Sequence, residues 1–284
     1  MNILSFDIEE WFHILDKPDS NNQESWQRFP SRINENINRI LRILDDRNLN
    51  ATFFCLGWIG EKYPNIIKQI DRCGHEIGTH SHSHKLVYEQ TPSEFNNDLK
   101  RSISVLSDIT GKKINSYRAP GFSITENQKW AFEIMYKNGI TIDCSIFPAQ
   151  RSHGGFSEFN ICKPTKIKLS SGFIKSYPMN TSSFLGINYV FSGGGYFRFI
   201  PYWVIKQLSN NTDYLMTYFH PRDFDIDQPI VPNLSYFRKF KSYYGLKNAE
   251  KKLHKYLDDF DFISLNQANN IIDWNKAQIV DFSK

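Results

Sequence analysis

Three histidines stand at alternate positions, His80, His82 and His84, in a chain that has only eight histidines. Neutral imidazole is a common ligand of Zn²⁺ and related divalent metals, and a site with three protein ligands leaves a position open for water. His80 and His84, four residues apart, can bind one ion if the segment forms a helical turn or a tight loop. A solvated polar loop is the alternative, so the cluster by itself leaves both interpretations open.

Carboxylates come from the stretch SFDIEEW, in which Asp7, Glu9 and Glu10 end a short apolar run. If this run is a regular strand, residues 7 and 9 lie on the same side of it. Acids at the end of a strand can act in catalysis, or they can cap a helix or occupy a solvated corner. The sequence therefore offers carboxylates for a site without choosing among them.

Further polar side chains follow other apolar runs: Arg118 in INSYRAPG, Asp143 in ITIDCSIF, and His220 in DYLMTYFHPRDFD, where Asp223 and Asp225 come next. In parallel sheets and barrels, functional groups collect at the C-terminal ends of the strands. The combined set contains one carboxylate and two histidines for a metal, with a spare acid and base. Arg118 could instead pair with a surface acid, and His220 could be a buried histidine of the core.

Alternating strands and helices must position these side chains. Capping boxes at Thr91–Glu94 and Thr125–Gln128 begin two predicted helices, and Ser31 is a candidate cap for a third at about 31–47. Short apolar runs between the helices predict buried strands over the first 150 residues. This alternation predicts an α/β fold with a parallel sheet or barrel.

The alternation stops at about residue 151, where Gly, Ser, Pro and aromatic residues dominate until about 212. We interpret residues 151–212 as an insertion of loops and short strands, after which a buried strand resumes. The remaining residues, about 226–284, form a C-terminal extension with a helix at about 247–258. No repeat or linker divides the chain, so we predict one domain over residues 1–284.

The composition excludes several classes of protein. Lys and Arg number 34 against 30 Asp and Glu, and this net charge of +4 is spread along the chain, which argues against nucleic-acid binding. No apolar run is long enough to span a membrane, and no signal peptide follows Met1, so a cytoplasmic location is expected. The four cysteines show no CxxC spacing, so neither a zinc knuckle nor a disulfide framework is predicted. The oligomeric state is not predicted.

In chain order, these segments resemble the polysaccharide deacetylase family, also called the NodB-homology family or carbohydrate esterase family 4. SFDIEEW resembles its first motif, HSHSH its H-[ST]-x-x-H motif, and RAP (residues 118–120) its R-x-P motif. DCSIFP resembles the fourth motif weakly, and YLMTYFHP the last. FSGGGYFR and YFHPRDFD resemble a subgroup with a C-terminal extension that is associated with exopolysaccharide or surface-glycan assembly.

The resemblance implies a distorted (β/α) barrel with fewer than eight strands. It also implies a role for each residue of the matching motifs. Asp7 would be the general base, oriented by Arg118, and His220 the general acid, tuned by Asp143. The metal ligands would be His80, His84 and an acid of the first motif. The family has adjacent aspartates there, whereas Ile8 follows Asp7 in this chain, so we assign the ligand to Glu9, with Glu10 as the alternative. Expected substrate contacts are Pro120, Tyr196 and Arg198, the arginine for a carboxylate or phosphate.

The implied activity is a metal-dependent N-deacetylase that hydrolyses the acetamide of an N-acetylated sugar in a surface polysaccharide or its precursor. Zn²⁺ is the expected metal, with Co²⁺, Ni²⁺ and Mn²⁺ as alternatives. Two other functions remain open: another C–N hydrolase on the same fold, such as a deformylase or an allantoin-type amidase, and a non-catalytic glycan-binding relative that has lost its metal. The sequence does not indicate which sugar or linkage is bound.

Overall fold

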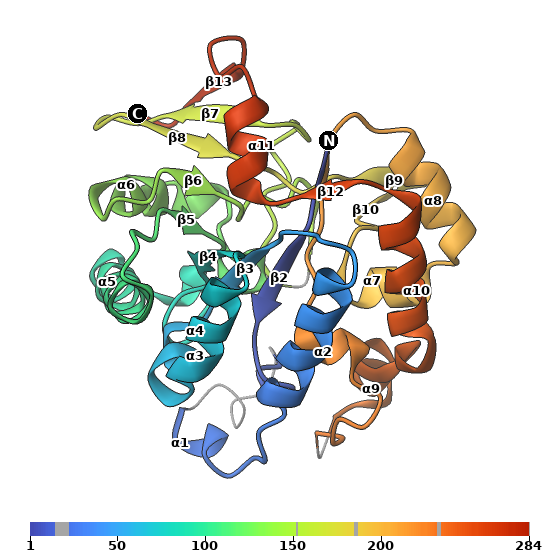
Figure 1. The fold of residues 1–284 in the computed structure, drawn as a ribbon. Coiled ribbons are helices and arrows are strands. Elements are labelled where there is room, and N and C mark those ends of the chain that lie inside the picture. The colour runs from blue at the N-terminus through green and yellow to red at the C-terminus, as the bar shows by residue number, and fades with distance from the viewer. Residues whose placement is uncertain (15–22, 152, 185–186, 232–233, 284) are drawn as a thin grey trace.

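The computed structural model describes residues 1–14, 23–151, 153–184, 187–231 and 234–283. Its largest sheet has the strand order β13-β7-β8-β6-β5-β4-β3-β2, with parallel strands at its centre (Figure 1). The parallel strands are β2 (Ser5–Ile8), β3 (Thr52–Cys55), β4 (Glu76–Thr79), β5 (Ser116–Tyr117), β6 (Ile142–Asp143) and β8 (Phe173–Ser176). At the far edge, β7 (Thr165–Lys168) is antiparallel to β8, and β13 (Gln278–Asp281) is parallel to β7.

Helices cover the outer side of these strands and explain the periodic apolar residues of the first half of the chain (Figure 1). In α2 (Ile33–Asp45), the residues at helical spacing are buried, including Ile37, Ile40 and Leu44. The same side carries α3 (Gly57–Lys62), α4 (Pro64–Arg72), α5 (Pro92–Thr110) and α6 (Trp130–Lys137). Shorter turns are α1 (Gln23–Trp26), η2 (Val87–Glu89), η3 (Pro120–Phe122) and η4 (Glu126–Gln128).

The two predicted capping boxes have different outcomes. Thr91 and Glu94 form a complete capping box at the start of α5, and the helix ends at Gly111, whose φ of 68° suits glycine. Thr125 instead accepts a hydrogen bond from the amide of Asn127, and the chain makes the 3₁₀ turn η4 before α6 begins at Trp130. The second helix therefore starts later than predicted.

The predicted α/β fold is confirmed, but the described strands do not close into a barrel. A second sheet, β11-β1-β12, joins the first because β1 (Asn2–Ile3) runs directly into β2. Its outer strands are β11 (Leu215–Met216) and β12 (Phe262–Ile263). Between β8 and β11, a side chain bridges the gap: Asn180 donates to the Tyr214 carbonyl at 2.5 Å and accepts from the Met216 amide at 2.8 Å.

The second half of the chain packs against the first. Residues 151–212 include the hairpin β9 (Ser182–Phe184) and β10 (Ile187–Tyr189) and the helices α7 (Gly194–Phe199) and α8 (Tyr202–Asn210). After η5 (Pro221–Phe224) come α9 (Tyr236–Tyr243), α10 (Leu246–Asp259) and α11 (Leu265–Ile271). Ion pairs join α2 to α10: Arg39 with Glu250 at 3.3 Å and Arg47 with Asp258 at 2.9 Å. The C-terminal residues also supply β12, which pairs with β1.

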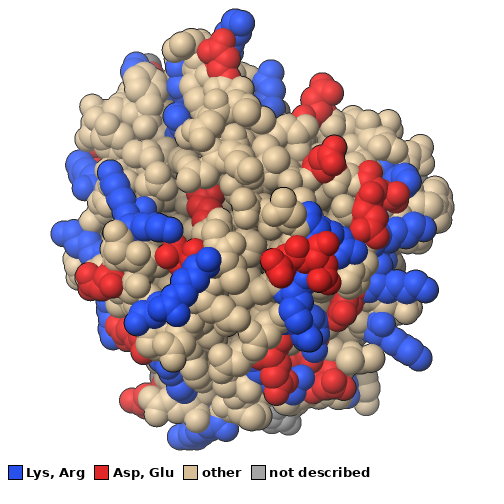
Figure 2. Space-filling model, in the orientation of Figure 1, with Lys and Arg blue, Asp and Glu red and all other residues tan. Residues whose placement is uncertain are grey.

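Acidic and basic side chains are mixed over the face of the molecule that Figure 2 shows. No large patch of one sign stands out on that face, which agrees with the even spread of charge along the sequence. Among the helices within the described ranges, none has both the length and the apolar composition needed to cross a membrane.

Candidate active site

The C-terminal ends of β2 and β4 bring one carboxylate and two imidazoles together. Glu9 follows β2, and its Oε1 lies 2.9 Å from Nε2 of His80 and 2.8 Å from Nε2 of His84. All three side chains are buried, and their ligand atoms lie within 4.8 Å of one another. Residues that are far apart in the sequence, Glu9 and the two histidines, therefore lie together in the structure.

A tight loop after β4, and not a helical turn, aims the two histidines at the same point. Ser81 and His84 have positive φ values of 69° and 58°, which turn the backbone sharply. Asp98 of α5 holds this turn, because its carboxylate accepts hydrogen bonds from the amides of His82 at 2.8 Å and Ser83 at 2.9 Å. His82 itself packs behind the loop, with its Nε2 3.8 Å from Glu61 Oε2.

The hydrogen bonds of His80 fit a metal ligand. Its Nδ1 lies 2.8 Å from the Arg118 carbonyl, which can only accept, so Nδ1 carries the proton and Nε2 of the neutral ring presents its lone pair. That lone pair faces a carboxylate oxygen of Glu9, which is also an acceptor, so a proton or a cation is needed at this point. Nitrogen and oxygen donors of this kind suit Zn²⁺ and related divalent ions.

The charge of Glu9 is stabilised by its neighbours. Burial by itself would raise the pKa of this carboxyl, but the neighbouring imidazoles of His84, His220 and His80 hold the pKa well below its usual value. Glu10, the alternative ligand, faces away from the histidines and caps α2, where it accepts from Ser31 Oγ and from the amide of Arg32 at 3.2 Å. The structure thus brings Glu9, and not Glu10, to the histidine pair.

Asp7 and Arg118 form a buried ion pair beside this cluster. Arg118 Nη1 lies 2.7 Å from Asp7 Oδ1, and both side chains are almost completely buried. The guanidinium stacks on the ring of Phe54 at 4.3 Å and is within 3.3 Å of the Cys144 carbonyl through Nε. These contacts fix the orientation of the Asp7 carboxylate.

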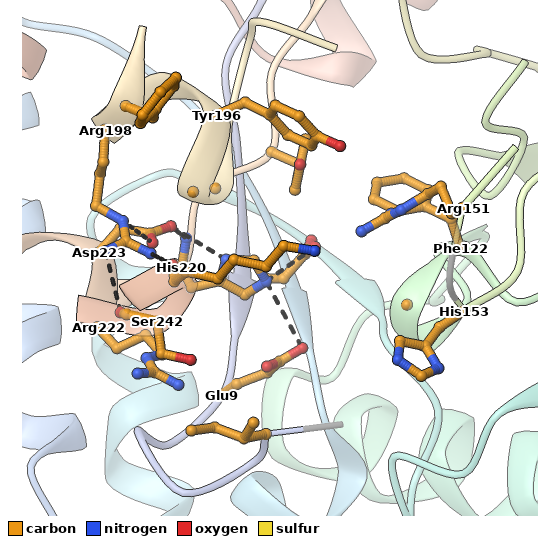
Figure 3. Close-up of a pocket in the computed structure, with 18 of the residues that line it drawn as sticks. Glu9, Phe122, Arg151, His153, Tyr196, Arg198, His220, Arg222, Asp223 and Ser242 are labelled. Atoms are coloured by element: carbon orange, nitrogen blue, oxygen red, sulfur yellow. Dashed lines mark hydrogen bonds and ion pairs between the residues drawn. The ribbon is translucent and has the colours of Figure 1, made fainter. Parts of the chain in front are cut away.

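His220 approaches the same cavity from the end of β11 (Figure 3). Its Nε2 lies 4.0 Å from Asp7 Oδ2 and 4.0 Å from Glu9 Oε1, while its Nδ1 lies 3.1 Å from Asp223 Oδ2. Burial lowers the pKa of the imidazole, but the negative charges of Glu9, Asp223 and Asp7 outweigh it and raise the pKa to about 9. The ring is therefore a cation near neutral pH in this arrangement.

Asp143 does not take the position that the sequence suggested. Within the described part of the chain, it accepts hydrogen bonds from the Ser145 amide at 2.9 Å and Ser176 Oγ at 2.7 Å, and Asp223 is the carboxylate bonded to His220. Burial raises the pKa of Asp143 to about 6. The resemblance implied that Asp143 tunes His220, whereas the short turn η5 brings Asp223 against that ring.

The three expected substrate contacts differ in their access to the cavity. Tyr196 lines the cavity and is 40% exposed. Arg198 lines it too but is buried, with Nε 3.1 Å from Asp223 Oδ1 and its other nitrogens bonded to carbonyls of residues 241, 242 and 244. Pro120 is buried behind the wall, where Gly121 and Phe122 line the cavity instead.

The residues that line the cavity but were not singled out in the sequence include His13, Arg151 and Arg222. His13 packs its ring on His84, with centroids 5.7 Å apart, and burial keeps its pKa well below the usual value. Its position in EEWFH, close to the first motif, was a usable signal. Arg222 follows His220 by two residues, whereas Arg151 lies in a loop where no pattern indicates a role.

The cavity has a volume of about 1080 Å³. That is at the upper end of the usual range for small-molecule sites, so it has room for more than a single sugar ring. The arrangement as a whole offers a metal site, a carboxylate fixed by an arginine, and a protonated imidazole fixed by a carboxylate.

Comparison with known proteins agrees with this chemistry. Residues 19–140 match the polysaccharide deacetylase family, and residues 144–270 match a family described as a domain of unknown function, DUF3473. A peptidoglycan-N-acetylglucosamine deacetylase of Bacillus cereus is 40% identical over 96 residues, which are 34% of this chain and 35% of the relative. A protein of Shewanella sediminis named as a 4-deoxy-4-formamido-L-arabinose-phosphoundecaprenol deformylase is 35% identical over 102 residues, 32% of each chain.

The chain thus spans about a third of the length of these curated relatives. The structural similarity to solved proteins covers more of the chain than the sequence similarity does. A crystal structure described as a polysaccharide deacetylase of Mycobacterium smegmatis superposes with a TM-score of 0.65 at 15% identity, covering 99% of this chain and 93% of that one.

Proposed function

Because this chain belongs to the polysaccharide deacetylase family, we propose that it is a metal-dependent hydrolase that removes the acetyl group from an N-acetylated sugar in a surface polysaccharide or its precursor. One observation carries the proposal: Glu9, His80 and His84 converge in the same cavity as the Asp7 and His220 side chains. Each of these groups has a task in amide hydrolysis, and their distances allow them to act on one bond.

Glu9 Oε1 and the Nε2 atoms of His80 and His84 would hold the ion, with Zn²⁺ expected and Co²⁺, Ni²⁺ or Mn²⁺ as alternatives. A divalent ion bound there supplies a Lewis acid for the amide carbonyl and lowers the pKa of a bound water. The Arg118 carbonyl keeps the proton of His80 on Nδ1, so that Nε2 is free to bind the ion.

Asp7 would act as the general base. Its Oδ1 lies 2.7 Å from Arg118 Nη1, and this contact fixes the orientation of the carboxylate. Its Oδ2 faces the cavity, 4.0 Å from His220 Nε2, and can accept the proton of the attacking water. Loss of the Asp7 carboxylate should therefore remove turnover without removing a metal ligand.

His220 would act as the general acid. Asp223 accepts from Nδ1, so the proton on Nε2 points into the cavity toward the leaving amine. Asp223 is in turn fixed by Arg198. Burial by itself would raise the pKa of Asp223, but the hydrogen bond from His220 and the charges of Arg198 and His220 lower it to about 2. The carboxylate thus stays ionised and keeps His220 protonated.

The test is mass spectrometry of metal-loaded protein incubated with formyl, acetyl and ureido derivatives of amino sugars, alone and within glycans. We expect loss of one acetyl group, and no loss with the Asp7→Asn variant, which keeps every proposed metal ligand. Loss of formyl groups alone would favour a deformylase, a function supported by the similarity to the formamido-arabinose enzyme of Shewanella sediminis.

The remaining alternative is a glycan-binding protein without catalysis. Metal analysis of the purified protein separates it from the proposed hydrolase, because the hydrolase must bind an ion at Glu9, His80 and His84. Protein that cannot be loaded with any divalent ion and removes no acyl group would contradict the proposed function.

A further inference from the structure

Two arginines on the cavity wall have no carboxylate partner among the described residues. Arg151 and Arg222 come from different parts of the chain, one from the loop after β6 and one from η5, and both line the cavity. Figure 3 shows Arg151 extending into the cavity beside Phe122, on the side opposite His220 and Asp223. Arg222 lies on the same side as His220.

Aromatic rings hold the Arg151 guanidinium in place. It lies over the ring of Phe147 at 4.5 Å and that of Phe122 at 5.2 Å, and its Nη1 is buried without a hydrogen bond to any described residue. Cation–π contact fixes the orientation of a guanidinium but does not neutralise its charge. The side chain is therefore positioned and still lacks an anion.

Arg222 shows the same pattern closer to the metal site. Its guanidinium lies 5.6 Å from the ring of Tyr243, and its Nη2 is buried without a hydrogen-bond partner in the described chain. Burial lowers the pKa of Arg222, and the charge of Arg198 acts in the same direction; Tyr243 and the charges of Asp223 and Glu9 oppose this shift without reversing it. A buried guanidinium without a paired anion is unfavourable. Binding of an anion at Arg222 would therefore lower the free energy of the site.

The described carboxylates that line the cavity do not pair with Arg151 or Arg222, because each carboxylate has another partner. The acids among the described lining residues are Asp7, Glu9 and Asp223. Asp7 is paired with Arg118, Glu9 with the two histidines, and Asp223 with Arg198 and His220. The wall also carries Lys241, so the region outside the catalytic groups is positive.

We propose that the substrate carries an anionic group, a carboxylate or a phosphate, and that Arg151 or Arg222, which lie on opposite sides of the cavity, binds it while the acetamide lies at the catalytic groups. This inference rests on the proposed function and specifies its substrate class. The arginine that the sequence suggested for such a group, Arg198, is committed to Asp223 and backbone carbonyls. A planar guanidinium that lacks a partner can accept a carboxylate or phosphate in two parallel hydrogen bonds.

The test measures binding to the metal-loaded Asp7→Asn protein, which should hold substrates without hydrolysing them. The probes are N-acetylglucosamine, its 6-carboxylate (N-acetylglucosaminuronic acid) and its 1-phosphate, titrated by calorimetry. We expect at least one anionic probe to bind about tenfold more tightly than the neutral sugar, the effect of one charge-assisted hydrogen bond. A preference for the carboxylate alone indicates an acidic sugar, and a preference for the phosphate alone indicates a phosphate-linked precursor.

Arginine variants of the Asp7→Asn protein then show which side chain causes the preference for an anionic probe. One of the two variants, Arg151→Gln or Arg222→Gln, should remove most of the difference between anionic and neutral probes and leave the affinity for N-acetylglucosamine unchanged. Arg72→Gln is the matched control, because Arg72 is exposed at the end of α4, away from the cavity. Equal affinity for all three probes, or a preference that survives in both cavity variants because the metal alone attracts the anion, would overturn the inference.

Failure of this inference and of the proposed function can be told apart. If the anionic probes bind through Arg151 or Arg222 but no acyl group is ever released, the proposed hydrolase is wrong and the anion site stands. If neutral and anionic N-acetylated sugars are deacetylated with the same kcat/KM, the hydrolase stands and the anion site is wrong.

Discussion

At the scale of single residues, the site is organised by which partner each titratable group finds. His80 and His84 both face Glu9 Oε1, whereas the neighbouring Glu10 caps α2. Asp223 supports His220, and Asp143 bonds to serines deeper in the sheet. Equivalent-looking acids therefore have different chemistry, because burial and neighbouring charges set each pKa.

Separate substitutions of Glu9 and Glu10 test which of these two acids binds the metal. Glu9→Gln should weaken metal binding at least tenfold, since an amide oxygen replaces a charged ligand. Glu10→Gln should keep the metal and lower the free energy of unfolding by about 1 kcal/mol, the value of a helix cap. Metal content after dialysis and urea unfolding give the two readouts. Metal loss in Glu10→Gln with retention in Glu9→Gln would reverse the assignment.

Asp223 can be tested through the pH dependence of turnover. The Asp223 charge helps to raise the pKa of His220 to about 9, and a general acid is active below its pKa. In Asp223→Asn that pKa should fall, so activity should decline at a lower pH than in the natural protein. The measurement is kcat from pH 6 to 10, with the exposed Asp227→Asn as control. An unchanged alkaline limb would exclude Asp223 from supporting His220.

At the scale of elements, the ends of β2, β4 and β11 bring the chemistry together. The β2–β3–β4 pairing places Asp7 opposite Phe54 and Cys55 opposite Thr79, so the residues after β2 and β4 emerge on the same edge. The bridge between Phe6 and Phe219 sets His220 beside them. Parallel pairing is thus what converts separate motifs into one site.

The loop between β4 and α5 gives a test at this scale. Asp98→Ala should weaken metal binding by about 10-fold to 100-fold, because Asp98 anchors the amides of residues 82 and 83 and so aims His80 and His84. Asp108→Ala, exposed on the same helix, is the matched control. Competition with a chelator measures the metal affinity. Equal affinities in the two variants would show that the loop holds its shape without Asp98.

At the scale of the whole molecule, the second half of the chain completes the site that the first half begins. Arg198 of α7 joins Asp223 of η5 to backbone carbonyls at the C-terminal end of α9, and all of these elements lie beyond residue 190. The strands β11 and β12 flank β1, which anchors this half to the N-terminal strand. We therefore expect the two halves to unfold together.

Arg198→Met tests this connection. Removing Arg198 from this buried ion pair leaves Asp223 with His220 as its cationic partner among the described residues, so the free energy of unfolding should fall by about 3 kcal/mol, the lower end of the range for a broken buried pair. The alkaline limb of kcat should also move, because Asp223 would no longer be held against His220. Urea unfolding followed by both fluorescence and circular dichroism tests whether one transition remains. A loss of stability with an unchanged pH profile would give Arg198 a structural role alone.

The sequence by itself determined the local features: the alternation of strands and helices, the capping box of α5, and the motifs around Asp7, His80, Arg118 and His220. These follow from periodicity and spacing, which act over a few residues. The tertiary structure alone decided which groups meet: Asp223 and not Asp143 at His220, Arg198 beside Asp223, and Arg151 and Arg222 without a carboxylate partner among the residues that the structure describes. It also decided that Asn180 bridges an open seam in the sheet. The physical reason is that ion pairs and pKa values depend on distances between elements far apart in the chain, and no local pattern encodes those distances.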